Sequence, residues 1–256
     1  MTDWARRLAT APYEVVGRFA DASNATLLAR LTDEVDAPLP EGATLDDLDP
    51  AHLAVYKPRR GEAPLWDFPE GSLHRREVAA FLVSEALGWD LVPTTVLRPD
   101  GPFDEGSLQR FVVFDPELHY FTLRESDDPR VRRQLEQMVV FDVVVDNADR
   151  KGGHVLVEDV DDTPRIRLID HGVCFHAEHH LRTVAWDFAH DPVPDVLRDD
   201  VARLGEWLAA DGEAALAPLL DLAELESLAA RIEVVVDDLT HFPEPIGPRP
   251  FPWPLL

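Results

Sequence analysis

The sequence predicts an α+β protein in two parts, an antiparallel sheet with one helix followed by a mainly helical region. Two observations predict it. Short runs in which apolar and polar residues alternate lie within residues 13–114. This alternation is typical of half-buried strands. Later in the chain, apolar residues recur every three to four positions, which is the period of amphipathic helices, in residues 128–145, 201–208 and 225–239. We therefore expect a small lobe of residues 1–114 and a helical lobe of residues 115–256.

The composition is that of a globular protein with a large acidic excess. The chain has 256 residues and a formal charge of −25 at pH 7, which disfavours nucleic acid and anionic membrane surfaces as partners. Cys174 is the only cysteine, so no intrachain disulfide forms and a reducing compartment is expected. The sequence has no apolar run of signal-peptide or transmembrane length, so we expect a cytoplasmic protein without membrane insertion.

The first two strands are expected at residues 14–19 and 25–31, joined by a turn that contains Ser23 and Asn24. Such a turn can present backbone N–H groups to a phosphate. A plain surface hairpin accounts for the same pattern equally well. Residues 33–50 are rich in acid and proline and are interpreted as a solvated connection.

The next strand, at residues 52–58, contains one of the two lysines of the chain. Lys57 and Lys151 are the only lysines of the chain, and all its other lysine-type or arginine-type cations are arginines. A lysine is a compact point charge that arginine does not imitate, so both positions are candidates for holding phosphate. An exposed lysine at a strand end is the alternative interpretation of Lys57.

The rest of the small lobe is expected to form one helix and two strands. The helix spans residues 73–87 and stops at Gly88, which is a typical C-terminal cap. Strands at residues 92–97 and 107–114 would complete a five-stranded antiparallel sheet. A turn signal, Arg-Pro-Asp-Gly-Pro, separates them.

A polar loop follows the helix expected at residues 128–145 and carries two acids of interest. The loop contains Asp149 in the sequence Asp-Asn-Ala-Asp-Arg-Lys-Gly-Gly-His. A strand is expected from His154, and after a turn a second strand runs into Asp170. The two acids are thus expected at the ends of adjacent strands. Kinases need such a pair, because one Asp orients the attacking hydroxyl and another holds the magnesium that bridges the nucleotide phosphates.

This stretch resembles the catalytic loop of kinases. In protein kinases a metal-binding Asn lies five residues after the catalytic Asp. Here the fifth residue after Asp149 is His154, and the tripeptide Asp-His-Gly that begins at Asp170 stands where D-F-G would stand. Asp-Arg at Asp149 is also similar to the D-R-H-x-x-N loop of phosphatidylinositol 3-/4-kinases and HipA-like kinases, and of an actinobacterial family related to them. The resemblance implies a two-lobed, protein-kinase-like fold that binds ATP with Mg²⁺ or Mn²⁺.

The same resemblance assigns roles in the helical lobe. It implies that Asp149 is the catalytic acid–base residue and that Asp170 and His154 hold the metal. His154 departs from the pattern, because imidazole suits transition metals better than magnesium. Three outcomes are therefore open: a preference for manganese, weak phosphoryl transfer, or no transfer. Lys151 takes the place of the His of D-R-H and is expected to steady the γ-phosphate electrostatically.

In the small lobe, the resemblance implies that Lys57 holds the α- and β-phosphates, as the lysine of a V-A-I-K strand does. Its expected partner is Glu77 on the following helix, and Glu85 is the competing acid. Either acid is otherwise a solvated helix residue.

The resemblance also places an adenine-holding hinge where the strand at residues 107–114 ends. Phe111 and Val112 are therefore candidate nucleotide contacts, with a buried strand leading to a turn as the other interpretation. The turn with Ser23 and Asn24 corresponds to the loop that covers the phosphates.

Three classes of function remain from the sequence. The first is a phosphotransferase that uses ATP and a divalent metal on an unknown hydroxyl acceptor. The acceptor is a protein, a small molecule or a lipid headgroup, and the negative charge of the chain disfavours the lipid. If the nucleotide binds in the reversed orientation, the group transferred is adenylyl instead of phosphoryl. The second is a pseudokinase that binds nucleotide or a partner without transfer. The third is a metal-dependent hydrolase, because one stretch contains side chains that bind zinc: His154, Asp170, His171, Cys174, His176, His179 and His180.

Overall fold

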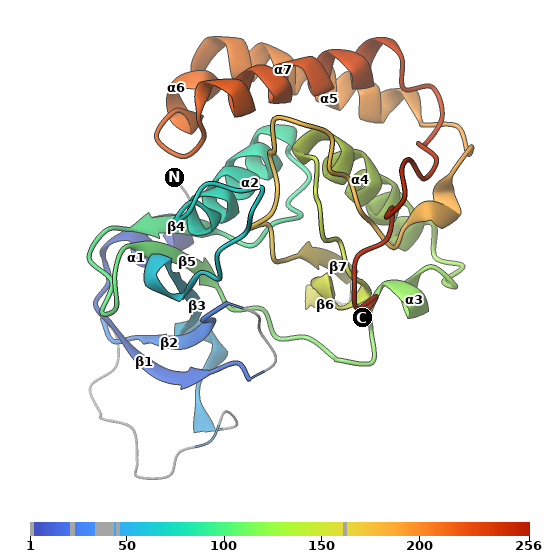
Figure 1. Ribbon diagram of the computed structural model, residues 1–256. Coiled ribbons are helices and arrows are strands. Elements are labelled where there is room, and N and C mark those ends of the chain that lie inside the picture. Colours follow the sequence, from blue (N-terminus) through green and yellow to red (C-terminus); the bar gives the residue numbers. More distant parts are fainter. Residues whose placement is uncertain (1–2, 21–23, 34–43, 45–46, 161–162) are drawn as a thin grey trace. The chain divides into compact units, whose positions relative to one another are not determined.

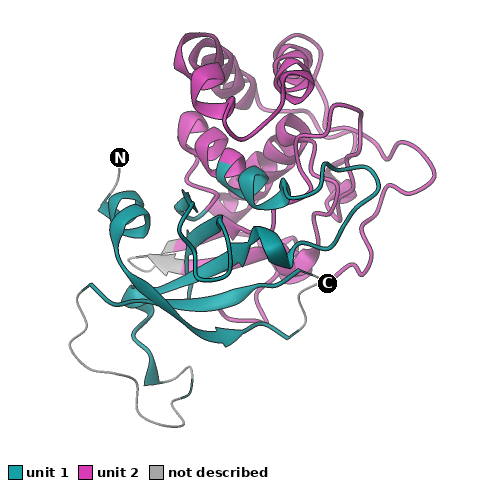
Figure 2. Cartoon of the chain, turned by 60° about the vertical axis from the view of Figure 1, so that its left-hand side comes forward, with its two compact units in different colours: residues 1–78, 93–113 teal, residues 79–92, 114–256 magenta. Residues whose placement is uncertain are grey.

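In a computed structural model, the chain folds into two compact units (Figures 1 and 2). The structure describes residues 3–20, 24–33, 44, 47–160 and 163–256. Unit 1 comprises residues 1–78 and 93–113, and unit 2 comprises residues 79–92 and 114–256. Unit 1 carries the large sheet and unit 2 most of the helices, so the predicted α+β fold class is confirmed. The lobe boundary expected after residue 114 stays a prediction.

Unit 1 is built on the predicted five-stranded antiparallel sheet. Its strands are paired in the order β1-β2-β3-β5-β4, and they are β1 (Tyr13–Arg18), β2 (Leu27–Leu31), β3 (Leu53–Pro58), β4 (Thr95–Arg98) and β5 (Gly106–Arg110). Alternate strand residues point to one face and share a core with the first helix, and the buried members of this core are Leu8, Ala11, Leu27, Ala29, Leu31, Ala54, Tyr56 and Leu108. Apolar alternation along short strands therefore specifies this sheet.

Strand β4 begins at Thr95, three residues later than predicted. Pro93 has no N–H with which to join the ladder. The N–H of Val92 donates instead to the hydroxyl of Ser84, at 3.1 Å. The apolar residues before the proline therefore belong to the connection from the preceding helix and not to the sheet.

The sequence pattern predicts no element before residue 13, yet the chain forms helix α1 (Asp3–Thr10). The side chain of Leu8 is fully buried, and the helix packs against β4. Arg98 of β4 donates to the carbonyl oxygens of Leu8 and Ala11, each at 2.9 Å. Helices this short are marginal alone, so distant contacts stabilise α1.

Helix α2 (Leu73–Leu87) has the predicted bounds. Gly88 follows it with φ of +68°, the left-handed conformation that glycine adopts without strain after a helix. Most of its residues are buried, including Arg76 and Glu77. It therefore carries charged side chains into the interior as well as apolar ones.

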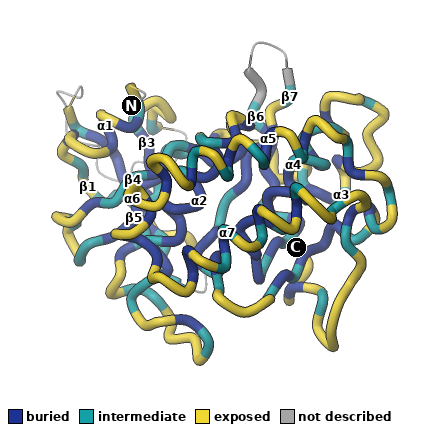
Figure 3. Tube along the Cα trace, turned by 90° about the horizontal axis from the view of Figure 1, so that it is seen from above, coloured by how far each residue is buried: buried dark blue, intermediate teal, exposed yellow. Residues whose placement is uncertain are grey.

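Unit 2 contains the remaining helices and a two-stranded hairpin. The hairpin pairs β6 (Val155–Val160) with β7 (Thr163–Leu168) in antiparallel fashion, as predicted. In α7 the buried residues recur every three to four positions, so that buried and exposed stretches alternate along its trace (Figure 3). None of the described helices has the length and apolar character needed to cross a membrane. The helices are α3 (Tyr120–Leu123), α4 (Pro129–Val145), α5 (Asp195–Trp207), α6 (Glu213–Leu216) and α7 (Leu222–Asp237).

Candidate functional site

The polar loop with Asp149 lies between α4 and β6. Helix α4 ends at Val145, and Asp146 follows it with φ of +50°, which turns the chain out of the helix. Asn147 then fixes the loop, because its side-chain oxygen accepts the N–H of Asp149 at 2.9 Å and its amide nitrogen donates to Asp142 at 3.1 Å. One turn of 3-10 helix, η4 (Gly152–His154), leads into β6. Short-range hydrogen bonds thus hold the backbone at Asp149.

A buried ion pair that sequence reasoning missed anchors this loop. Arg150 has no exposed surface, and its guanidinium donates to the Asp142 carboxylate at 2.9 Å. The guanidinium also donates to the Ile169 carbonyl at 3.1 Å and to Nε2 of His171 at 2.9 Å. Because a guanidinium has only donors, Nε2 of His171 accepts. The available signal was an acid, Asp142, in the apolar end of α4.

Lys151 and Asp149 are the partly exposed charged residues of the loop. Nζ of Lys151 lies 2.9 Å from Oδ2 of Asp149. Burial raises the pKa of Asp149 above its usual range, and the charge of Asp170 raises it further, although Lys151 and Arg150 act in the opposite direction. The Asp149 side chain still has 29% of its surface exposed. A reachable carboxylate with a raised pKa is suited to accept a proton from a substrate.

His154 and Asp170 meet where the hairpin strands begin and end. Nε2 of His154 lies 3.4 Å from Oδ2 of Asp170, and the two side chains are 13% and 45% exposed. The N–H of Ile169 donates to the His154 carbonyl at 3.1 Å, which holds the two chain segments together. Asp170 has φ of +62°, a left-handed conformation that Asp tolerates better than most residues.

This nitrogen and oxygen pair fits a divalent ion that keeps several water ligands. Magnesium in phosphate-transfer sites typically binds one or two carboxylates together with waters, and a carboxylate also suits manganese. Asp170 and His154 supply one donor each from adjoining positions. Within the part of the chain that the structure describes, no group of three or more His, Cys, Asp or Glu side chains is placed to hold a metal.

In unit 1, the structure brings together Lys57 of β3 and Glu77 of α2 as an ion pair. The Glu77 side chain is 2% exposed and that of Lys57 is 20% exposed. The carboxylate therefore holds the ammonium at the edge of the interior. Of the two acids considered as partners for the lysine, Glu77 makes this contact.

The remaining predicted nucleotide contacts of unit 1 lie apart along the chain. The side-chain oxygen of Asn24 accepts the N–H of Ala63 at 2.7 Å, which ties the first turn to the loop after β3. Ser23 lies outside the described residues. Strand β5 ends at Arg110, so Phe111 and Val112 follow the strand, and Val112 is buried.

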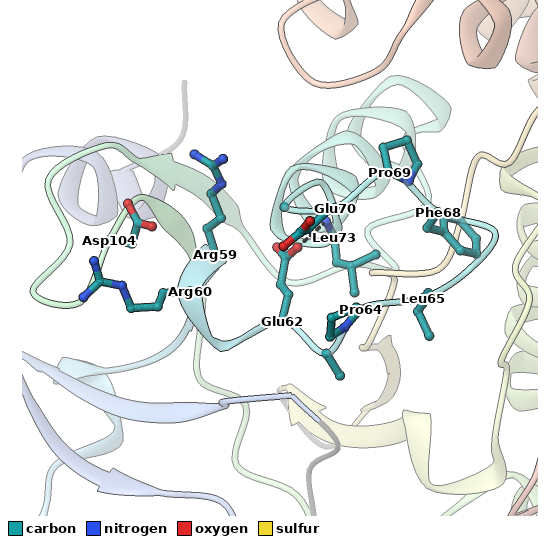
Figure 4. Close-up of a pocket in the computed structure, with 12 residues that line it drawn as sticks. Arg59, Arg60, Glu62, Pro64, Leu65, Phe68, Pro69, Glu70, Leu73 and Asp104 are labelled. Carbon is teal, nitrogen blue, oxygen red and sulfur yellow. Dashed lines mark hydrogen bonds between the residues drawn. The ribbon is translucent and has the colours of Figure 1, made fainter.

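A cavity of about 540 Å³ lies on unit 1, lined by twelve residues (Figure 4), eleven of them between Arg59 and Leu73 and the twelfth Asp104. Of the predicted site residues that the structure describes, none lines it. Beside it, the Glu62 carboxylate accepts the first backbone N–H groups of α2, from Leu73 at 3.2 Å and His74 at 2.8 Å. Burial opposes ionisation of Glu62, but its hydrogen bonds with His74 and these amides outweigh burial and lower its pKa. The cavity is therefore bordered by a capped helix start.

The histidines considered for a zinc site make other contacts. The rings of His176 and His180 are in contact, with centroids 3.9 Å apart and planes tilted by 41°. Nδ1 of His179 lies 3.4 Å from the buried Asp146 carboxylate, and this hydrogen bond raises the pKa of His179. His171 accepts from Arg150. These contacts leave the hydrolase hypothesis without a ligand set among the described residues.

The chain was compared with known sequences. No family profile matches the chain. Protein Rv2133c of Mycobacterium tuberculosis is 38% identical over 282 residues, and the match covers 96% of this chain and 93% of that protein.

The chain was also compared with solved structures. The Helicobacter pylori proinflammatory kinase CtkA matches with a TM-score of 0.51 and 12% identity, over 89% of this chain and 93% of that chain. Hydra Fam20 with sugar matches with a TM-score of 0.52 and 12% identity, over 91% and 86%. HipA of Shewanella oneidensis, solved with HipB and operator DNA, gives a TM-score of 0.45 and 11% identity, over 87% and 65%. The first two similarities show a kinase-like fold.

Proposed function

The chain belongs to the family of Protein Rv2133c, and on this premise we propose that it is an atypical kinase, a phosphotransferase that uses ATP and a divalent metal on a hydroxyl acceptor. The observation that carries the proposal is the use of lysine. Lys57 and Lys151 are the only lysines in the chain, and each pairs with a predicted site carboxylate, Glu77 or Asp149. Ammonium groups held in place by carboxylates suit the positioning of phosphates.

In the proposed mechanism, Asp149 accepts the proton of the attacking hydroxyl. Its raised pKa brings it closer to the working pH, and its backbone is held by Asn147. Proton transfer of this kind is efficient when the pKa of the base approaches the operating pH. Lys151 lies beside Asp149 and would stabilise negative charge that develops on the transferred phosphoryl group.

The nucleotide phosphates are proposed to bind Lys57, held by Glu77, and the metal to bind Asp170 and His154. A divalent ion held by these two residues would neutralise the charge of the phosphates. Asn24, Ser23, Phe111 and Val112 are proposed as further nucleotide contacts. Membership of the phosphatidylinositol 3-/4-kinase or HipA-like groups, and the choice between Mg²⁺ and Mn²⁺, belong to this proposal.

A pseudokinase is the second candidate, and the contact between His154 and Asp170 favours it. An imidazole 3.4 Å from the carboxylate replaces the amide oxygen that kinase loops offer to magnesium. Such a site binds nucleotide without the metal geometry needed for transfer.

The experiment that tests the proposal compares Asp170→Ala with Asp149→Ala. An Asp that holds the metal acts in the ground state, whereas one that orients the nucleophile acts mainly in the transition state. We therefore expect Asp170→Ala to abolish metal-dependent ATP binding in calorimetry. Asp149→Ala should keep binding and lose transfer of labelled γ-phosphate. Equal loss of binding in both variants would refute these roles, and binding without any transfer by the unmodified chain would favour the pseudokinase.

A further inference from the structure

The segment 250–256 lies on the loop that carries Asp149, within unit 2. The Pro250 carbonyl accepts two hydrogen bonds, from the N–H of Thr183 at 3.2 Å and from the indole N–H of Trp186 at 3.0 Å. The Leu255 carbonyl accepts the N–H of Gly152 at 2.7 Å. In Figure 1 the red end of the chain accordingly finishes beside α3 and β6. The segment thus contacts the loop three residues beyond Asp149.

The hydrogen bond to Thr183 uses the side of residues 182–184 that Arg150 leaves open. Residues 182–184 pair with Arg150 on one side, because the Arg150 N–H donates to Arg182 at 3.0 Å and the Val184 N–H donates to Arg150 at 3.1 Å. Backbone groups of successive residues in an extended chain point in opposite directions. The N–H of Thr183 therefore points away from Arg150 and meets the segment. Proteins also capture polypeptides through backbone hydrogen-bonding groups that are left open in this way.

The site and the segment have complementary chemistry. The three site groups, from Gly152, Thr183 and Trp186, are all donors. Alternate residues of the segment, at 250, 252 and 254, are prolines, which lack an N–H and offer only carbonyl oxygens. Proline rings also restrict the backbone of the segment before it binds, which lowers the entropy cost. The donors thus suit a proline-containing polypeptide.

Side-chain burial contributes little to holding the segment. Trp253 is 88% exposed, and Phe251, Leu255 and Leu256 are also exposed; among residues 251–256 only Pro252 is buried. The segment is therefore held mainly through its backbone carbonyls. Another chain that presents carbonyl groups at the same positions can therefore replace the segment.

Gly152 permits the close approach of the segment to the loop. A Cβ atom at this position would lie 2.7 Å from the Phe121 ring and 3.3 Å from the Leu256 side chain. Residues 250–256 contain no Ser, Thr or Tyr, so the bound segment has no hydroxyl that could receive a phosphoryl group.

We propose that Gly152, Thr183 and Trp186 form a binding site for a proline-containing polypeptide, and that residues 250–256 occupy this site in cis. This site extends the proposed function and depends on it only for the transfer of phosphate to the bound polypeptide. A polypeptide acceptor displaces the segment and brings its hydroxyl to Asp149, so the resident segment inhibits transfer. Polypeptide binding itself requires neither ATP nor metal.

The first test uses the chain ended after Pro248 and a fluorescent peptide of residues 249–256, without nucleotide. We expect the shortened chain to bind the peptide and the full chain to bind it at least tenfold more weakly, because its own segment competes. A peptide with the three prolines at 250, 252 and 254 replaced by glycine keeps the carbonyls and loses the rigidity. It should bind more weakly. Absence of peptide binding to a folded shortened chain overturns the inference.

The second test uses the full chain, so that it decides the question even if the shortened chain does not fold. Trp186→Phe removes the indole donor and keeps an aromatic ring. Hydrogen exchange at the amides of Gly152 and Thr183 should accelerate several-fold. The matched control is Trp253→Phe, a change in an exposed ring, which should leave both rates unchanged. Unchanged exchange in Trp186→Phe overturns the inference.

These tests separate the inference from the proposed function. If the peptide binds but the unmodified and shortened chains transfer no phosphate, the polypeptide site stands and the phosphotransferase is refuted. If transfer occurs at the same rate in both chains and the peptide does not bind, the phosphotransferase stands and the polypeptide site is refuted.

Discussion

Lys57 on β3 and Glu77 on α2 form an ion pair in which the carboxylate is almost completely removed from solvent. A buried carboxylate that loses its counter-ion is strongly destabilising, whereas the pair itself contributes little net stability. The arrangement therefore makes the fold of unit 1 sensitive to the one ammonium group that we propose for phosphate binding. Stability and nucleotide binding must be measured separately.

Replacing Lys57 with Met should abolish ATP binding and lower the free energy of unfolding, because the buried Glu77 carboxylate loses the ammonium group that it contacts. In the double variant Lys57→Met/Glu77→Gln the stability should return and the ATP binding should not. Calorimetry and urea denaturation measure the two effects. Arg60→Met, a change of an exposed cation in the same segment, is the control and should change neither. ATP affinity equal to that of the unmodified chain in Lys57→Met would show that unit 1 does not hold the phosphates through this residue.

The pH dependence of transfer should depend on Lys151. Burial raises the pKa of Asp149 and Lys151 lowers it. If Asp149 acts as its carboxylate, the rate falls as pH decreases through this pKa. Lys151→Met removes the lowering influence, so the acid limb of kcat should move to higher pH, and kcat should fall by about tenfold or more through loss of charge stabilisation. An acid limb at the same pH in both proteins contradicts the assignment of Asp149 as base.

The choice of metal should depend on His154. An amide oxygen suits magnesium better than an imidazole does, so His154→Asn should shift metal-dependent nucleotide binding from Mn²⁺ toward Mg²⁺. Titration of ATP binding with each ion measures this. The control is His190→Asn, an exposed histidine with φ of +70° that asparagine tolerates. If His154→Asn and His190→Asn have the same ion preference, His154 does not hold the metal and is only the start of a strand.

The stability of unit 2 should depend on the pairing of Arg150 with Asp142. Arg150→Leu leaves the buried Asp142 carboxylate without its counter-ion, which should cost about 3–5 kcal/mol. The double variant Asp142→Leu/Arg150→Leu replaces the pair with apolar side chains and should recover a large part of that loss. Urea denaturation compares the three proteins. A double variant less stable than Arg150→Leu would mean that the carboxylate has a stabilising role beyond this pair.

Much of the fold could be predicted because its signals are local. Alternation specifies the sheet strands, a helical period with a glycine stop specifies α2, and a turn between two apolar runs specifies the hairpin β6–β7. The candidate loop was visible for a similar reason, since Asp149, Lys151 and His154 lie within six residues of one another. Their contacts form over short stretches of chain.

The parts that could not be predicted depend on contacts between distant residues. Helix α1 is stabilised by Arg98, and nothing in its own eight residues shows this. The role of Arg150 was missed because an arginine beside a catalytic candidate suggests a solvent-facing phosphate contact, whereas its side chain is fully buried. The contact of Gly152 with the C-terminal segment likewise joins residues that sequence spacing does not relate.

The sequence separation of these contacts has a consequence for the order of folding. Asp142 and Arg150 are eight residues apart, and the hairpin that follows is also local, so each closes a short loop at a small entropy cost. The contact between Gly152 and Leu255 spans about two fifths of the chain. Contacts between residues close in sequence form faster than distant ones, because they close shorter loops. On a ribosome, the loop with Asp149 can therefore assemble while residues 250–256 are not yet synthesised, and a nascent chain passes through a stage in which its polypeptide site is open.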